Sequence, residues 1–449
     1  MKVFFALIAL LSALPATAET LDLGQAIERA LKADPRIEEK RHFVAAARGL
    51  RQEAEGHGDW FVESNSFIGL SPATEGNIFE SGSCSSGQCE LRGDKYEFTG
   101  VSPWFYAKLG LIKPLYTFGK LEHYAAAAEA NIHVKEGDVR LQRNATVLDV
   151  KKAYYGYLAA RDGSLLLGDV SARVQKAIDL VQGWLDEGEG DVKMTDLYAL
   201  QSGYAMVAKY KAQSDVLEKV ALDGLKVLTG VALSDELEVA DRRIRPVALP
   251  EWSLPELQQQ ALQQRPEMGQ LESGLKARRS LLEASKSNNK PNIYAGLGAL
   301  LSYSPGRESL NNPYISDPFN ERALTPVIGM KWNWSPGVSR GKTSIAEAEL
   351  NALIAKSSFA RMGIPFQVAE QYHQVQGLYE AVRQLEQASR SARRWMIASY
   401  TDFEAGLEEA EKIMAAMQAY TLAMADYLQT TFEYNMHVAR LQDVAGINQ

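Results

Sequence analysis

The residue types that could support chemistry gather in a few places along the chain, beginning with its two cysteines. Cys84 and Cys89 stand close together in a segment rich in Ser and Gly. A close cysteine pair in an exported chain typically forms a small disulfide, whereas a structural zinc site needs four ligands. We therefore expect a disulfide between Cys84 and Cys89, and no metal site.

Acidic residues gather around two glycines, Gly188 and Gly406. The acidic residues near these glycines are Asp186, Glu187, Glu189, Asp191, Asp196, Asp402, Glu404, Glu408, Glu409 and Glu411. Carboxylates at this density attract cations and repel anions. A solvated segment end with no further role is the alternative for any one of them.

The sequence carries no signature of a familiar enzyme or cofactor site. The six histidines have no metal-ligand spacing such as H-E-x-x-H, and there is neither a P-loop nor a G-x-S-x-G motif. The formal net charge is −8, from 48 Lys and Arg against 56 Asp and Glu, which disfavours a nucleic-acid binder. We expect no enzyme activity, no cofactor and no nucleic-acid partner.

The N-terminus has the pattern of a secretory signal peptide. Lys2 precedes an apolar run from Val3 to Leu14, and Ala16-Thr17-Ala18 resembles a cleavage site. We assign residues 1–18 to the signal peptide. No stretch of the sequence reaches 18 consecutive apolar residues. A chain that enters a membrane after export must therefore do so with β-strands.

The remaining sequence is a tandem repeat, and repeats decide architecture. The matched residues are Ala30, Leu31 and Pro35 with Ala261, Leu262 and Pro266; Gly119 and Lys120 with Gly341 and Lys342; and Val150, Tyr154 and Gly188 with Val368, Tyr372 and Gly406. We expect a first structural repeat at 19–230, a linker or equatorial segment at 231–250, and a second repeat at 251–449.

Each repeat contains long stretches with helical periodicity. The apolar positions recur three or four residues apart at Val170, Val174, Ile178, Val181 and Leu185, and again at Val375, Leu378, Val382 and Leu385. Residues 119–186 contain no proline, and as one helix they would span roughly 100 Å, a length typical of coiled coils. With turns at Gly188 and Gly406, we expect long antiparallel helical hairpins at 119–229 and 338–447.

Between the first helix and the long helices of each repeat, the apolar period becomes two. The alternating residues are Trp60, Val62, Ile68 and Leu70; Ala107, Leu109 and Leu111; Ile293, Ala295, Leu297, Ala299 and Leu301; and Ile328, Met330, Trp332 and Trp334. They predict β-hairpins at about 60–116 and 292–334, with surface loops at 71–102 and 303–325.

These predicted strands suit a membrane, since each is about as long as a tilted transmembrane β-strand. Trp60, Trp104, Trp332 and Trp334 lie in or beside them, as expected for an aromatic belt at the membrane interface. A soluble hairpin packed on helices is the alternative. Four strands cannot close a barrel, and open edges are not tolerated in lipid, so the membrane interpretation requires an oligomer that pools strands.

Taken together, these features resemble the TolC-type outer-membrane efflux proteins, or outer membrane factors, over nearly all of the mature chain. The motifs that carry the resemblance are Ala30-Leu31-x-x-x-Pro35 with its copy at 261–266, Pro114-Leu115-Tyr116-x-Phe118-Gly119-Lys120, Leu225-x-x-Leu228-x-Gly230, and Phe403-Glu404-Ala405-Gly406-Leu407. The resemblance implies an α+β membrane protein with long coiled-coil α-hairpins and transmembrane β-hairpins. Three chains would pool these elements into a 12-stranded barrel and a periplasmic α-barrel.

The resemblance also implies a function and partners. A homotrimer in the outer membrane of a Gram-negative bacterium, extending into the periplasm, would be the passive exit duct of a tripartite efflux pump or type I secretion system. Its partners would be outer-membrane lipid, a periplasmic adaptor and an inner-membrane transporter. A periplasmic coiled-coil adaptor or structural protein is the alternative.

The resemblance places the gate and the adaptor contact at the two helical turns. The candidate residues are Asp186, Gly188, Asp191, Asp196, Asp402, Gly406, Glu408, Glu409 and Glu411, and threefold repetition would make each inward acid a ring that attracts cations. The family often carries a D-x-x-D pair after the second tip glycine, but this chain has Lys412 and Ala415 there. That departure puts strong cation selectivity in doubt.

Overall fold

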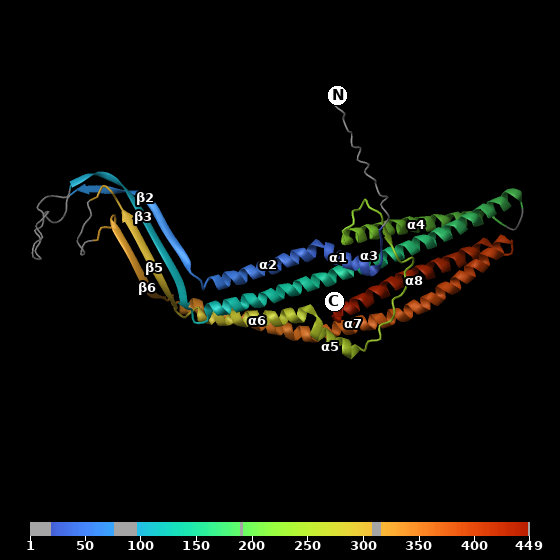
Figure 1. Ribbon diagram of the computed structural model, residues 1–449. Coiled ribbons are helices and arrows are strands. Elements are labelled where there is room, and N and C mark those ends of the chain that lie inside the picture. The colour runs from blue at the N-terminus through green and yellow to red at the C-terminus, as the bar shows by residue number, and fades with distance from the viewer. Residues whose placement is uncertain (1–18, 76–96, 189–191, 308–315, 448–449) are drawn as a thin grey trace, which may run out of the picture. The chain divides into compact units, whose positions relative to one another are not determined.

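The structure is a computed structural model that describes residues 19–75, 97–188, 192–307 and 316–447 (Figure 1). The predicted signal peptide, Cys84, Cys89 and Asp191 lie outside these residues. The described chain divides into two compact units. One contains residues 19–43, 134–271 and 356–447, and the other contains residues 44–133 and 272–355.

The order of elements along the chain occurs twice. The first series is β1 (Glu19–Leu21), α1 (Leu23–Ala33), α2 (Pro35–Gly56), β2 (Phe61–Glu75), β3 (Glu97–Tyr116), α3 (Lys120–Glu187) and α4 (Met194–Thr229). The second is β4 (Leu237–Val239), α5 (Leu254–Gln264), α6 (Pro266–Ser287), β5 (Asn292–Tyr303), β6 (Glu321–Lys331), α7 (Pro336–Glu404) and α8 (Ala410–Val444). Corresponding helices match closely in length: 11 and 11 residues for α1 and α5, and 68 and 69 for α3 and α7.

The structure corrects one of the residue matches made from the sequence. Gly119 lies in the turn before α3 with φ of 82°, whereas Gly341 lies inside α7. Gly188 and Gly406 are equivalent, since each follows the end of a long helix with φ of 71°. The long helices of the two repeats therefore correspond at the 218-residue spacing that separates Gly188 from Gly406. The segment at 231–250 also contains strand β4.

The four long strands form one antiparallel sheet in the order β2-β3-β5-β6. The strands reach further than the alternation predicted, because Ser71 pairs with Ser102 and Pro72 with Val101 inside the expected loop. Strand β6 likewise begins at Glu321, within the second expected loop. Serine and proline weaken the apolar alternation, but backbone pairing continues through them, and proline is tolerated on the edge strand β2. The predicted antiparallel strands are confirmed, and the predicted loops were too long.

The long helices pack through the apolar seams that the sequence indicated. Val170, Val174 and Val181 of α3 are buried with Leu200 of α4 and Phe403 of α7 in one apolar cluster. Trp184 meets the Phe403 ring edge-on at 5.3 Å between ring centroids. Val375 and Val382 of α7 are buried in a second cluster with residues of α5 and α8. The predicted long helices and their buried faces are confirmed.

The bends between α1 and α2 and between α5 and α6 each carry a salt bridge across a proline. Asp34 and Arg36 flank Pro35, with 2.8 Å from Arg36 Nη2 to Asp34 Oδ2. Burial raises the pKa of Asp34, but hydrogen bonds from Arg36 and from Thr146 outweigh it and hold that pKa below its usual value. At the matching positions Arg265 and Glu267 pair at 2.5 Å with the charges exchanged. The bend is conserved between the repeats while its polarity is reversed.

Candidate functional site

The register of the sheet brings the predicted apolar stripes onto one face. Side chains alternate along a strand, and directly paired residues share a face. Val62 pairs with Leu111, Leu111 with Leu297, and Leu297 with Pro326, which places one stripe from each strand side by side. We call this surface the apolar face. Its apolar members include Val62, Ile68, Leu70, Phe105, Ala107, Leu109, Leu111, Ile293, Ala295, Leu297, Ala299, Leu301, Leu324, Pro326, Ile328 and Met330.

Charge is confined to the two ends of the apolar face. Among the residues paired in this register between 61–70, 103–113, 293–303 and 322–330, only Lys113 and Arg322 are charged on it. Lys113 lies near the helix end of β3, and its Nζ is 5.7 Å from the centre of the Trp60 ring. Arg322 stands at the opposite end, at the start of β6. Long cationic side chains at the edges of an apolar band can extend their charged groups to the water interface.

The opposite surface, which we call the polar face, carries glycine and polar residues. Its members include Glu63, Asn65, Gly69, Lys108, Gly110, Gly296, Gly298, Ser302, Thr325 and Gly329. Two aromatic rings cover glycines on neighbouring strands: Trp104 lies over Gly69, and Tyr294 lies over Gly329. The same face also carries Phe61, Phe67, Tyr106, Ile112, Leu300 and Val327, so the two faces differ mainly in that the glycines and most polar side chains lie on this one.

The four tryptophans predicted to lie at the membrane interface are found at both ends of the sheet. Trp60, Trp332 and Trp334 lie at the helix end of the sheet and are more than half exposed, and Trp332 Nε1 donates to the Asn289 carbonyl at 3.0 Å. Trp104 lies on the polar face toward the loop end, where its Nε1 donates to Ser302 Oγ at 2.8 Å. Their role at a membrane interface stays a prediction.

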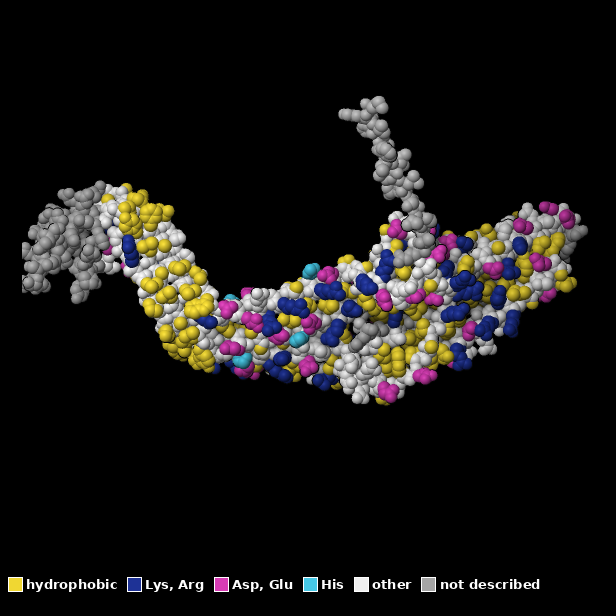
Figure 2. All heavy atoms as spheres, in the orientation of Figure 1, with side chains coloured by type: hydrophobic (Ala, Val, Ile, Leu, Met, Phe, Trp, Pro, Cys, Tyr) yellow, Lys and Arg dark blue, Asp and Glu magenta, His cyan; other side chains and the backbone are white. Residues whose placement is uncertain are grey.

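Figure 2 shows hydrophobic side chains gathered over the strands, whereas Lys, Arg, Asp and Glu are scattered over the helices. Among the described residues, no helix combines the length and the apolar composition needed to cross a membrane. The described ranges also contain no group of three His, Cys, Asp or Glu side chains placed to hold a metal ion.

The second predicted tip is a tight turn closed by Gly406. After α7 ends at Glu404, the amide of Gly406 donates to the Phe403 carbonyl, and the amide of Leu407 donates to the Asp402 carbonyl, both at 2.9 Å. This bonding pattern requires a left-handed residue at Gly406, which glycine adopts without strain. The Leu407 side chain remains 79% exposed beyond the turn. The turn therefore presents an exposed apolar side chain, with Glu404, Glu408 and Glu409 close to it in the sequence.

A lysine neutralises one of the predicted acids at this tip. Lys412 Nζ lies 2.6 Å from Oε1 of Glu408, which is four residues earlier, just before the start of α8. The hydrogen bond and the charge of Glu408 raise the pKa of Lys412 above its usual value, so the Lys412 ammonium stays charged at neutral pH. Asp402, Glu409 and Glu411 are exposed around it.

The first predicted tip is described on either side of 189–191. Asp186 and Gly188 are exposed at the end of α3. Asp196 has a structural role, because its Oδ2 accepts the backbone N–H of Lys193 at 2.8 Å and so satisfies the start of α4.

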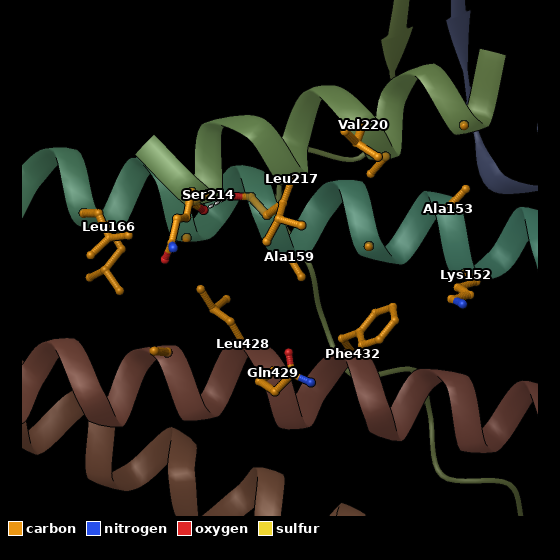
Figure 3. A pocket seen from close by; sticks show the side chains of 18 of the residues that line it. Lys152, Ala153, Ala159, Leu166, Ser214, Leu217, Val220, Leu428, Gln429 and Phe432 are labelled. Atoms are coloured by element: carbon orange, nitrogen blue, oxygen red, sulfur yellow. Dashed lines mark hydrogen bonds between the residues drawn. The ribbon is translucent and has the colours of Figure 1, made fainter. Parts of the chain in front are cut away.

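An open apolar groove between α3, α4 and α8 was not predicted from the sequence. The groove has a volume of about 1110 Å³. Small residues of α3, including Gly156, Ala159 and Gly163, line one side together with Leu217 of α4, and Phe432 of α8 stands across the groove (Figure 3). The recurrence of Gly and Ala along α3 was the signal that could have revealed it.

Comparison with known proteins identifies the fold. No protein-family model and no curated protein matches the sequence. Among solved structures, the Campylobacter jejuni CmeC outer membrane channel superposes with a TM-score of 0.76 at 12% identity, covering 95% of this chain and 87% of that one. The open state of the Neisseria gonorrhoeae MtrE outer membrane channel gives 0.71 at 16% identity, covering 95% and 89%.

The outer membrane protein VceC of Vibrio cholerae gives a TM-score of 0.71 at 14% identity, with 94% of this chain and 96% of that one covered. The similarity thus extends over nearly the whole length on both sides. The chain has the fold of the TolC-type outer-membrane channels, as its sequence motifs predicted.

Proposed function

We propose that this protein is the outer-membrane exit duct of a tripartite efflux pump or type I secretion system. Three copies pool their sheets into a 12-stranded barrel and their helices into a tunnel through the periplasm. The duct is passive, and its periplasmic end opens and closes at the turns around Gly188 and Gly406. Export would be driven by an inner-membrane transporter, and a periplasmic adaptor would bind the helical tips.

The apolar face of the sheet is the observation that carries the proposal. On β5 it runs from Ile293 to Tyr303, about 33 Å at 3.3 Å per residue. A strand tilted by about 40° then rises about 25 Å, which is the height of the apolar band of outer-membrane barrels. Lys113 and Arg322 bracket this band, where lipid headgroups would meet their charges.

The two edges of the sheet support a pooled barrel. Strands β2 and β6 each have one side unpaired within the chain, and an unpaired edge in lipid leaves backbone groups unsatisfied at several kcal/mol each. Pairing β6 of one copy with β2 of the next removes every edge once the ring closes. The polar face, with its glycines, then lines the water-filled lumen.

The helical tips fit the gate and adaptor contact. The exposed acids around Gly406 would form rings by threefold repetition, and Leu407 supplies an exposed apolar contact beyond the turn. The comparison proteins are described as channels, which supports a duct and offers no support for an enzyme. Choice of cargo would belong to the transporter.

Native mass spectrometry of detergent-extracted outer membrane tests this proposal. We expect a trimer of the mature chain in the membrane fraction, with a mass somewhat below three times the 49.5 kDa full-length chain. The soluble periplasmic fraction of the same cells is the control. A monomer found there would overturn the proposal and favour a periplasmic adaptor or structural coiled coil.

A further inference from the structure

The segment between β4 and α5, residues 240–250, crosses α3 and α8 as an irregular strap (Figure 1). On α3, Asp162 Oδ2 accepts the backbone N–H of Ile244 at 2.8 Å. On α8, Asn435 Nδ2 donates to the Arg245 carbonyl at 2.8 Å. Asp162 and Asn435 are both buried, so these two contacts fix the position of the strap on the two helices.

The anchored part of the strap is rich in arginine. Arg242, Arg243 and Arg245 lie on either side of Ile244, whose side chain is only 3% exposed. All three arginines are exposed, and within the part of the chain that the structure describes none of them forms a salt bridge. The strap therefore holds three free guanidinium groups at one level of the helices.

Helix α7 brings a further arginine to the same place. Arg393 is exposed and likewise has no acidic partner among the described residues. Burial raises the pKa of Tyr420 on α8, and the positive charges of Arg393, Arg173 and Arg243 oppose that rise. These three arginines belong to α7, α3 and the strap, so positive charge from three separate segments converges on Tyr420.

The acids nearby neutralise only part of this charge. Asp169 pairs with Arg173 at 3.1 Å, and the carboxylate of Asp241 accepts the hydroxyl of Tyr154 at 2.7 Å. Even with the charges of Asp241 and Asp162 counted, the free arginines leave this surface positive. We call it the basic patch, and its members are Arg242, Arg243, Arg245 and Arg393. It is a local exception in a chain whose formal net charge is −8.

The chemistry of the basic patch fits a polymer that carries carboxylates. The planar guanidinium fork can donate two parallel N–H bonds to one carboxylate. Several such contacts at one level favour an extended polyanion over a single ion, because linked weak contacts add. Threefold repetition in the proposed trimer would multiply them again.

The level of the patch indicates which polymer it would meet. Asp162, beneath the strap, lies roughly 60 Å along α3 from the start of that helix and about 40 Å from its end. In the proposed duct this level is in the periplasm, away from the helical tips that would bind the adaptor. The carboxylate polymer that a duct through the periplasm must cross is the peptidoglycan of the cell wall.

We propose that the basic patch binds the carboxylates of cell-wall peptidoglycan and so ties the duct to the wall. The proposal rests on the proposed periplasmic duct and adds a partner to it. The partner is held by charge at the outside of the strap, whereas the strap's buried contacts with Asp162 and Asn435 keep the arginines in place.

Co-sedimentation of the detergent-extracted full-length protein with purified peptidoglycan sacculi tests the proposal. Native mass spectrometry first establishes that each protein used is a trimer. Arg243→Gln combined with Arg393→Gln removes two of the charges that converge on Tyr420 and leaves the anchors of the strap intact. We expect the apparent affinity for sacculi to fall about fivefold or more, and binding of the unaltered protein to weaken as salt is raised.

Arg279→Gln combined with Arg361→Gln is the matched control, because it removes two exposed arginines of α6 and α7 outside the patch. We expect this variant to bind sacculi as the unaltered protein does. Sacculi whose carboxylates have been amidated should bind neither protein.

Three outcomes with a trimeric protein would overturn the inference and leave the proposed duct standing. They are no binding to sacculi, equal binding with and without the patch arginines, and undiminished binding to amidated sacculi. Arginine-dependent binding of the purified adaptor in place of sacculi would also overturn it, in favour of a protein partner. A monomeric protein would overturn the duct as well.

Discussion

At the scale of single residues, Lys412 is the side chain that most changes the expected chemistry of the tip. It stands where an acid was expected from the resemblance, and it binds Glu408 at 2.6 Å. Each copy therefore contributes one neutralised acid to the turn, together with the exposed Asp402, Glu409 and Glu411. The field at the tip is weaker than the acid count alone predicts.

Replacing this lysine should raise cation selectivity. Lys412→Gln frees Glu408 and adds one negative charge per copy. A unit charge acting at about 10 Å through water is worth about 0.4 kcal/mol, or about a twofold change in local cation concentration. We expect the cation-to-anion permeability ratio, measured as a reversal potential in planar bilayers, to rise at least about twofold.

The control for this measurement is Lys286→Gln, which breaks a similar exposed pair with Glu283 on α6. We expect it to leave the reversal potential unchanged. If Lys412→Gln behaves like this control, the turn around Gly406 does not lie on the ion path.

Sequence reasoning located the tip residues but not the role of each one. Acid content and glycine position indicated the turns, and Gly406 closes its turn as expected. Whether an acid is free depends on the local backbone conformation, which brings Glu408 to Lys412 and lets Asp196 cap α4. Those partners are one turn away, and the sequence offered several acids with equally near neighbours.

At the scale of elements, the turn between α7 and α8 depends on the left-handed conformation of Gly406. A side chain there costs about 1–2 kcal/mol. We expect Gly406→Ala to loosen the turn without unfolding the long helices. Hydrogen exchange of the Gly406-position and Leu407 amides, which donate to Phe403 and Asp402, should accelerate about 5- to 30-fold in the variant.

Gly377→Ala is the matched control in the same helix. Gly377 lies inside α7 with open space where a Cβ would stand, so alanine should stabilise the helix by about 1 kcal/mol. Its tip amides should exchange at the unaltered rate. Equal exchange in both variants would mean that the turn tolerates a side chain and does not require glycine.

The elements were largely readable from periodicity, because a helix and a strand impose different repeats on their apolar residues. The 68-residue helix α3 and the four stripes of the sheet follow from that principle. The ends of the strands did not, since Ser71, Pro72 and Ser102 carry no alternation and are held by pairing. Register belongs to two strands at once and cannot be read from either sequence alone.

At the scale of the whole molecule, an arginine introduced on the apolar face of the sheet should impair assembly far more than one introduced on the polar face. Ala299 lies on the apolar face and Leu300, its neighbour, on the polar face. Arginine facing lipid near the middle of the bilayer costs about 2–4 kcal/mol. We expect Ala299→Arg to lower the amount of trimer in the outer membrane severely, while Leu300→Arg assembles nearly as well as the unaltered protein.

Heat-dissociation of extracted trimers on gels and quantitation of outer-membrane fractions would measure both variants. The comparison is internally controlled, because the same charge is placed one residue apart on one strand. Equal loss in both would contradict the assignment of the faces, and greater loss for Leu300→Arg would exchange lumen and lipid.

The short ladder between β1 and β4 has a consequence for the order in which the molecule is made. Glu19 lies opposite Leu237 in parallel pairing, so the leading strand has no partner until more than two hundred further residues have emerged. Because the chain is synthesised from its N-terminus, β1 stays without this partner while the whole of the first repeat is made. The pairing can form only after residues 237–239 have been made, so the packing of β1 depends on the segment that follows the first repeat.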